Sequence, residues 1–205
     1  MATKAKKAVK KTTKKTAKKA ANKSASKSDS GDLITMIMAD HKPLKDLIKI
    51  LKNSDDYEIE ERQEAFEEFA PLLVAHAKPE EQTMYVFMKA DEELREGGFE
   101  GDVEHQLADQ MVEEAKRTDD EDLWSARVKV LAELVEHHIK EEESEMLPDF
   151  RKNSDLEQRV QLGEQYMQLK TEIEAKGSDD APPEAMIKDA QNKKSDKIPN
   201  RNQVQ

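Results

Sequence analysis

The sequence predicts an all-α protein with one folded domain over about residues 32–175. Apolar residues recur in this region at steps of three and four, which is the spacing of the core-facing side of a helix. The alternation typical of half-buried strands is absent, and glycine is scarce. A chain of 205 residues, of which 39% are charged and 4% aromatic, has room for a single domain with a modest core.

A lysine-rich segment of low complexity precedes this domain. Residues 1–30 carry eleven lysines and one acidic residue, Asp29, so the rest of the chain must sum to about −21 to give the net charge of −11. Large apolar side chains are almost absent, and we expect a disordered arm. The arm is suited to binding nucleic acid through counterion release; alternatively, it keeps the protein soluble or folds back on the acidic domain. The lysines expected to contact nucleic acid form four doublets: Lys6 and Lys7, Lys10 and Lys11, Lys14 and Lys15, and Lys18 and Lys19.

The first helix is expected over residues 32–52, with Asp32 as its N-cap. Pro43 removes a backbone donor and should bend this helix beside His41. The predicted buried stripe is Ile34, Ile37, Met38, His41, Leu44, Ile48 and Leu51.

The second helix is expected over residues 58–90. Its stripe stays in phase on both sides of Pro71 and Pro79, so these prolines should kink the helix without ending it. Gly97, Gly98 and Gly101 then predict a turn. The predicted stripe is Phe66, Phe69, Leu73, His76, Glu80, Met84 and Phe87.

Two further helices should complete the core. A weaker one is expected over residues 102–117, with His105, Val112 and either Ala108 or Asp109 facing inward. The next begins after the acidic residues at 119–122 and should end at Pro148. Its predicted stripe is Trp124, Val128, Leu131, Val135, His138, Glu142 and Met146.

A trailing helix is expected over residues 155–175, packed on the outside of the bundle. Residues 176–205 predict a flexible tail to which we assign no function. The apolar residues available for packing in the trailing helix are Leu156, Val160, Tyr166, Leu169 and Ile173.

A repeated motif carries the chemistry. The motif around His76 and Glu80 in the second helix is repeated around His138 and Glu142 in the fourth. Aligned on the histidines, both segments have a lysine two residues later, a Glu-Glu pair at four and five, and a methionine at eight. A four-residue step places each histidine directly beside its glutamate on one helix face.

The core stripes contain too many polar groups for an ordinary core. Each of the four core helices contributes one histidine, and two stripes also contain glutamates: the set is His41, His76, Glu80, His105, His138 and Glu142. A single core histidine is usually a neutral imidazole with a hydrogen bond to a carbonyl group. Six buried polar groups with no lysine or arginine on the stripes require a compensating charge, which a cation supplies.

The donor types indicate which cation. Imidazole and carboxylate ligands without cysteine favour iron, or alternatively manganese, over structural zinc. Six ligands suit two metal ions, with terminal histidines and carboxylates able to bridge them. Such a centre binds a small diatomic or peroxidic ligand, enclosed here by Met, Leu and Phe side chains one turn away.

These motifs resemble the hemerythrin-like HHE cation-binding domain. The resemblance rests on four ordered motifs across about residues 32–175: Asp40-His41, His76-x-x-x-Glu80-Glu81, Glu104-His105 and His138-x-x-x-Glu142-Glu143. It implies an up-down-up-down four-helix bundle with a non-haem di-iron centre. It also implies that His41, His76, His105 and His138 are terminal ligands and that Glu80 and Glu142 bridge the two irons.

Two positions depart from the pattern or leave it open. Hemerythrins that carry oxygen reversibly have a second histidine four residues after the one in the third helix, where this chain has Asp109. Asp109 is therefore either an additional ligand or leaves a coordination position open, and either case disfavours reversible oxygen carriage. His137 lies off the buried stripe, and we interpret it as a surface residue or an outer neighbour of the centre.

The leading functional hypothesis is a di-iron protein that binds or reacts with dioxygen, peroxide or nitric oxide, in sensing, storage or stress protection. No nucleophile or phosphate loop indicates an enzyme, and peroxide decomposition would be a side activity. The alternatives are a nucleic-acid-associated protein that uses the lysine arm, and a bundle that serves only for interaction. No apolar run is long enough to span a membrane, and we expect no signal peptide and a location in the cytoplasm, with association with the nucleoid as the alternative.

Overall fold

The computed structural model describes residues 31–179; the lysine arm at 1–30 and residues 180–205 of the predicted tail lie outside the described residues. Within the described part the chain is entirely helical apart from its connections, which confirms the predicted all-α fold. None of these helices is both long enough and apolar enough to cross a bilayer.

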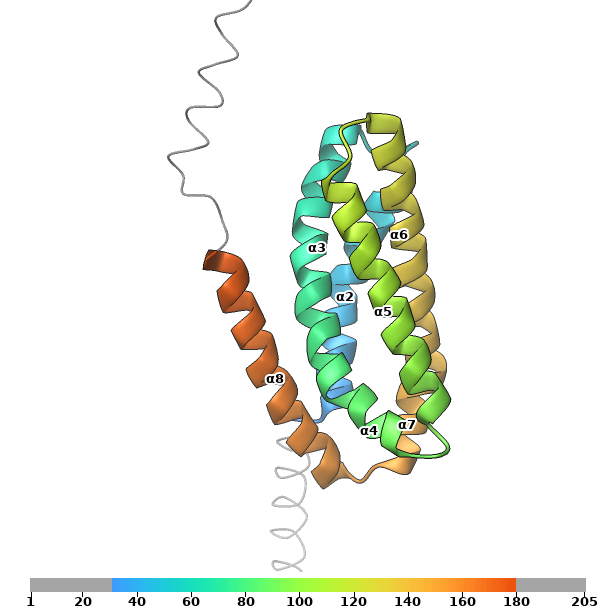
Figure 1. Ribbon diagram of the computed structural model, residues 1–205, viewed down its shortest axis with the longest axis vertical. Helices are drawn as coiled ribbons and strands as arrows, with labels where there is room; N and C mark the ends of the chain where they lie inside the picture. The colour runs from blue at the N-terminus through green and yellow to red at the C-terminus, as the bar shows by residue number, and fades with distance from the viewer. Residues whose placement is uncertain (1–30, 180–205) are drawn as a thin grey trace, which may run out of the picture.

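Four long helices run alternately up and down and form the bundle (Figure 1). They are α2 (Leu33–Lys52), α3 (Ile59–Gln82), α5 (Arg95–Lys116) and α6 (Glu121–Glu141). Three short elements, α4 (Met84–Ala90), the π-helical turn η1 (Glu142–Met146) and α7 (Leu147–Asn153), close one end of the bundle. The long helix α8 (Leu156–Asp179) lies outside the bundle and contacts α2 and α3.

Two apolar clusters fill the core. Between them lies a layer with the four histidines His41, His76, His105 and His138, which we call the histidine layer. One cluster contains residues of the four long helices on the side of the layer away from the short helices, such as Leu44, Phe69 and Val128. The other joins the start of α2 to the short helices and α8, and includes Phe150. Of the predicted stripe on α2, Met38 was assigned wrongly: it is 43% exposed, because it lies one residue past the buried Ile37 on the helix surface.

The predicted helix over 58–90 is broken at Thr83, and Pro71 and Pro79 lie inside α3. The Thr83 hydroxyl donates to the carbonyl oxygen of Pro79 at 2.6 Å, the group that the Thr83 N–H would use in a regular helix. The Thr83 N–H instead donates to the carbonyl of Glu80. This change of partner redirects the chain, and α4 starts at the next residue.

The predicted turn at Gly97, Gly98 and Gly101 was wrong, because all three glycines lie within α5. The reason is packing of α5 against α4. A Cβ atom at Gly101 would lie 2.6 Å from Cζ of Tyr85, and one at Gly98 would lie 3.0 Å from Cβ of Met88. These glycines let the two helices approach closely enough to bury Tyr85.

Pro148 does not end the fourth helix as predicted. The helical chain continues through η1 and α7 to Asn153, with Pro148 in the first turn of α7. Within η1 the Leu147 N–H donates to the carbonyl of Glu142, a step of five residues instead of four. This wider turn begins at Glu142, so a predicted site residue lies where the helix changes its winding.

The close contact at Gly101 predicts a stability difference between two neighbouring glycines. Gly101→Ala should lower the free energy of unfolding by about 1–3 kcal/mol, because the new methyl group overlaps the Tyr85 ring. Gly97→Ala is the matched control: its Cβ would meet only Met88 and Met146, at 3.5 and 3.9 Å, so it should be neutral or stabilising. Urea unfolding measures both, and equal effects would contradict the packing role of Gly101.

Candidate metal centre

Six of the predicted site residues meet in one layer of the bundle, between the two apolar clusters. Each of these residues is at most 3% exposed. They come from five elements, and each of the four core helices contributes one histidine. The residues are His41 on α2, His76 and Glu80 on α3, His105 on α5, His138 on α6, and Glu142 at the start of η1.

The six residues form two overlapping groups, each with the donors to hold a metal ion. The donor atoms within a group lie within 4.8 Å of one another. Glu80 belongs to both groups, so its carboxylate would be able to contribute to both metal positions. Glu142 also approaches both, because its Oε2 lies 3.1 Å from His41 Nε2 and 3.8 Å from His138 Nε2. The groups are His41, His76, Glu80 and Glu142, and Glu80, His105 and His138.

Each histidine directs its Nε2 atom into the layer. Those of His41 and His76 lie 3.1 and 3.5 Å from carboxylate oxygens of the layer. The Nε2 atoms of His105 and His138 lie only 3.0 Å apart. If both rings carry their hydrogen on Nδ1, two lone pairs face each other at this distance, and a cation between them would remove the repulsion. A hydrogen on either Nε2 would make the contact a hydrogen bond instead.

The opposite ring nitrogen, Nδ1, faces outward in three of the histidines toward a carboxylate from a different element. With the hydrogen on Nδ1, a neutral imidazole keeps its Nε2 lone pair for a metal, and the carboxylate raises its basicity. The three pairs are His41 with Glu143 at 2.9 Å, His138 with Glu104 at 2.6 Å, and His105 with Glu81 at 3.5 Å.

His76 has a different outer neighbour. Its Nδ1 lies 3.4 Å from the hydroxyl oxygen of Tyr166, a fully buried residue of α8, and this hydroxyl donates to Asp40 Oδ2 at 2.6 Å. Burial, with the nearby Glu80 and Asp40 carboxylates, raises the pKa of Tyr166. The group beside His76 is therefore a neutral phenol, with the negative charge one hydrogen bond further away.

Several buried polar atoms in the layer have no hydrogen-bond partner. An unsatisfied buried polar group costs about 1–3 kcal/mol, and more when it is charged. A concentration of such atoms at one point is what a bound cation would resolve, since all of them are metal-ligand atom types apart from the outward-facing His105 Nδ1. The atoms are Nε2 of His76, Oε1 and Oε2 of Glu80, Nδ1 of His105 and Oε1 of Glu142.

Glu80, Glu142 and His76 have pKa values that are shifted in different directions. Burial, and then the charge of Glu142, raise the pKa of Glu80 well above its usual value. Burial also pushes the pKa of Glu142 upward, but the hydrogen bond from His41 and the neighbouring histidines outweigh it, so that pKa is lowered. Burial and the other histidines lower the pKa of His76 well below its usual value. A metal would bind to a neutral His76 and displace the proton of Glu80.

Tyr85 is a site residue that the sequence analysis did not assign. Its hydroxyl lies 3.4 Å from His105 Nε2 and 3.3 Å from His138 Nε2. Burial, and then Glu142 and Glu80, raise its pKa well above its usual value, so it stays a neutral phenol. Its place five residues after Glu80 was visible in the sequence, but its direction depends on the break at Thr83.

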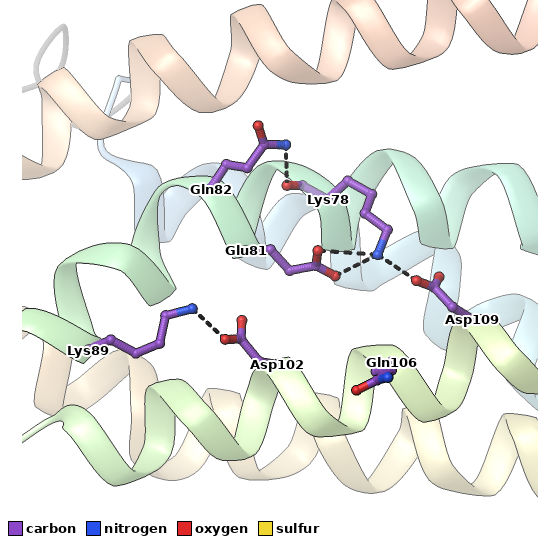
Figure 2. Close-up of a pocket in the computed structure, with 7 residues that line it drawn as sticks. All are labelled: Lys78, Glu81, Gln82, Lys89, Asp102, Gln106 and Asp109. Carbon is purple, nitrogen blue, oxygen red and sulfur yellow. Dashed lines mark hydrogen bonds and ion pairs between the residues drawn. The ribbon is translucent and has the colours of Figure 1, made fainter.

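Asp109 does not join the six residues. Its carboxylate is 34% exposed and lies 2.5 Å from Lys78 Nζ. Lys78 also contacts Glu81 Oε1 at 2.8 Å, so its ammonium group lies between the two acids, in a polar groove between α3 and α5 (Figure 2). Asp109 therefore reaches the layer only indirectly, through Lys78, Glu81 and His105.

His137 also lies apart from the layer. Its side chain is 61% exposed and its Nε2 lies 3.2 Å from Glu141 Oε1, one turn along α6. With Glu104, these two residues form a third group of neighbouring donor atoms, on the surface.

The analysis of the sequence did not assign the outer partners to the site. They are Asp40, Glu81, Glu104, Glu143 and Tyr166, of which the first four are adjacent in sequence to a predicted ligand.

The comparison with known families supports the interpretation of this layer. The sequence model of the hemerythrin HHE cation binding domain matches residues 32–150, which is more than half of the chain. The chain belongs to the hemerythrin HHE cation-binding domain family. Comparisons with curated proteins and with solved structures found no match. The matched segment of this hemerythrin-family chain includes all six residues of the layer and ends before α8.

The raised pKa of Glu80 predicts how the metal-free protein responds to pH. The folded state disfavours the charged form, so the free energy of unfolding should fall as pH rises from the usual carboxyl range through the raised pKa. Glu80→Gln should remove this loss and be more stable than the wild type at alkaline pH, on the order of 1–3 kcal/mol.

Urea unfolding of both proteins in a chelator, at several pH values, tests this prediction. Glu67→Gln, on the exposed side of α3, is the control and should not change the pH dependence. A difference between Glu80→Gln and the wild type that does not vary with pH would contradict the prediction.

Proposed function

We propose that this hemerythrin-family chain is a non-haem di-iron protein that binds or reacts with dioxygen, peroxide or nitric oxide. The observation that carries the proposal is the pair of overlapping His/Glu groups that share Glu80 within a buried layer. Imidazole and carboxylate donors without thiolate suit iron, with manganese as the other candidate metal. Such a centre supplies redox chemistry toward small oxygen and nitrogen ligands.

The protein's own residues would select and orient a small ligand. The apolar clusters on both sides separate the layer from the solvent, a surrounding that suits a small ligand. The Tyr85 hydroxyl faces the same two Nε2 atoms that would hold one ion, so it is placed to donate a hydrogen bond to a ligand bound there. We assign a role in sensing, storage or oxidative-stress protection, with peroxide decomposition as a side activity.

The proposal predicts about two irons per chain in protein purified from iron-supplemented cells, because there are two ligand groups. His76→Ala should lose at least one iron, whereas His137→Ala, a histidine on the surface, should keep both. Elemental analysis measures the iron, and optical spectra taken before and after reduction and exposure to oxygen show whether the metal responds to oxygen.

A metal-free wild type with an intact helical spectrum would contradict the proposal. It would leave a bundle used only for interaction, for which His76→Ala should cost little stability or increase it, since the variant removes a buried polar group.

The lysine arm supports a second candidate function, association with nucleic acid. Eleven lysines in residues 1–30 precede a strongly acidic remainder that should itself repel DNA. We infer that the arm would carry any such binding, with the metal site secondary or protective, and that the protein would then lie near the nucleoid of the cytoplasm.

This second candidate predicts that DNA binding depends on the arm and on salt. The full chain should retard DNA in a gel shift, and affinity should fall by about 10³-fold or more between 50 and 200 mM salt if six or more lysines contact phosphates. A chain that lacks residues 1–30 should not bind. Equal affinity of both chains for DNA, or an affinity that does not change with the salt concentration, would contradict the role of the arm.

A further inference from the structure

The helix α8 lies beyond the segment that matches the family, and it is anchored firmly to α2. Arg159 Nε donates to Asp32 Oδ2 at 3.0 Å, and both residues are buried. A Cβ atom at Gly163 would lie 2.3 Å from the carbonyl oxygen of Gly31, so only glycine permits this approach. Lys170 Nζ lies 2.6 Å from Asp40 Oδ2. Residues 159, 163, 166 and 170 follow helical spacing and form one face of α8.

Tyr166 is the member of this face that reaches the histidine layer. Its hydroxyl hydrogen is donated to Asp40 Oδ2 at 2.6 Å. The oxygen lone pairs therefore remain for His76, whose Nδ1 lies 3.4 Å away. In this arrangement the His76 hydrogen is on Nδ1 and the Nε2 lone pair faces the layer. Lys170, Asp40, Tyr166 and His76 thus form a continuous chain of polar contacts.

His76 differs from the other three histidines in this respect. Their Nδ1 atoms face the carboxylates of Glu143, Glu81 and Glu104, whereas His76 faces a phenol supplied by a helix outside the bundle. A carboxylate partner raises the basicity of a metal-bound imidazole more than a neutral hydroxyl does. The ligand group that contains His76 is therefore built differently from the group that contains His105 and His138.

We propose that Tyr166 is a positioning residue for His76, so that docking of α8 completes the metal centre and makes its two metal positions unequal. This inference rests on the proposed function. Because His76 alone loses its outer partner when the contact with Tyr166 is broken, the ion held by the group of His76 is the one whose release should accelerate. The position held by His105 and His138 keeps its metal when the contact with α8 is lost.

The test compares full-length wild type with Tyr166→Phe, which keeps the buried ring and removes only the hydroxyl. We expect the variant to stay folded and to release one of its two irons to a chelator about 10–100-fold faster than the wild type, with the other iron released at the usual rate. Asp40→Asn, which removes the charge that fixes the hydroxyl, should have an effect in the same direction.

Leu162→Ala is the matched control, because Leu162 is a partly buried residue of α8 that packs on the apolar cluster and has no polar atom to offer to His76. It should lower stability without changing iron release. Release of both irons at the wild-type rate from Tyr166→Phe would overturn the proposal, and so would equal acceleration by Leu162→Ala.

A second readout does not depend on iron. Nitrogen-15 NMR of the imidazole rings in chelator-treated full-length protein shows which nitrogen of His76 carries the hydrogen. We expect Nδ1 in the wild type and a mixture of Nδ1 and Nε2 in Tyr166→Phe. If the wild type purifies without iron, the proposed function fails, and this readout still decides the role of Tyr166: unchanged His76 signals in the variant would refute it.

Discussion

Six polar groups buried in one layer of a small bundle are the constraint on which the rest of the structure depends. Each histidine must be turned so that one ring nitrogen faces inward, and a polar partner beside the opposite nitrogen favours this orientation. The outer partners come from neighbouring elements. A side chain of η1 contacts the histidine of α2, one of α5 contacts the histidine of α6, one of α3 contacts the histidine of α5, and one of α8 contacts the histidine of α3. Since η1 continues α6, and Asp40 of α2 accepts the hydrogen bond of Tyr166, the contacts close into a ring, so the orientation of each ligand depends on the assembly of the whole bundle.

Lysines at the surface balance the acids of this ring. Lys45 lies 2.7 Å from Glu143, Lys78 lies 2.8 Å from Glu81, and Lys170 lies 2.6 Å from Asp40. Burial opposes ionisation of the two glutamates, but contacts with these lysines and with the histidines outweigh it and lower their pKa values. Glu81 and Glu143 therefore stay charged beside the imidazoles of His105 and His41. In a strongly acidic domain, this placement of cations keeps the layer from accumulating negative charge.

Close backbone packing positions the two tyrosines that reach the layer. Gly101 lets α5 approach α4 so that Tyr85 lies beside His105, and Gly163 lets α8 approach α2 so that Tyr166 lies beside His76. Both phenols remain neutral because they are buried near carboxylates. The two hydroxyls face different ring nitrogens: Tyr85 faces inward Nε2 atoms, where a ligand would bind, and Tyr166 faces the outward Nδ1 of His76.

The sequence alone determined the all-α class and the six residues that meet in the layer, because helical periodicity is local and places residues four apart, such as His76 and Glu80, on one face. Tertiary structure decided the break at Thr83, the helical state of Gly101 and the π-helical turn before Pro148, since each depends on a partner or winding that the periodicity does not specify. It also decided that Tyr166 meets His76, ninety residues away in the sequence. That contact exists only because α8 docks against α2 and α3, and docking is set by packing between distant segments.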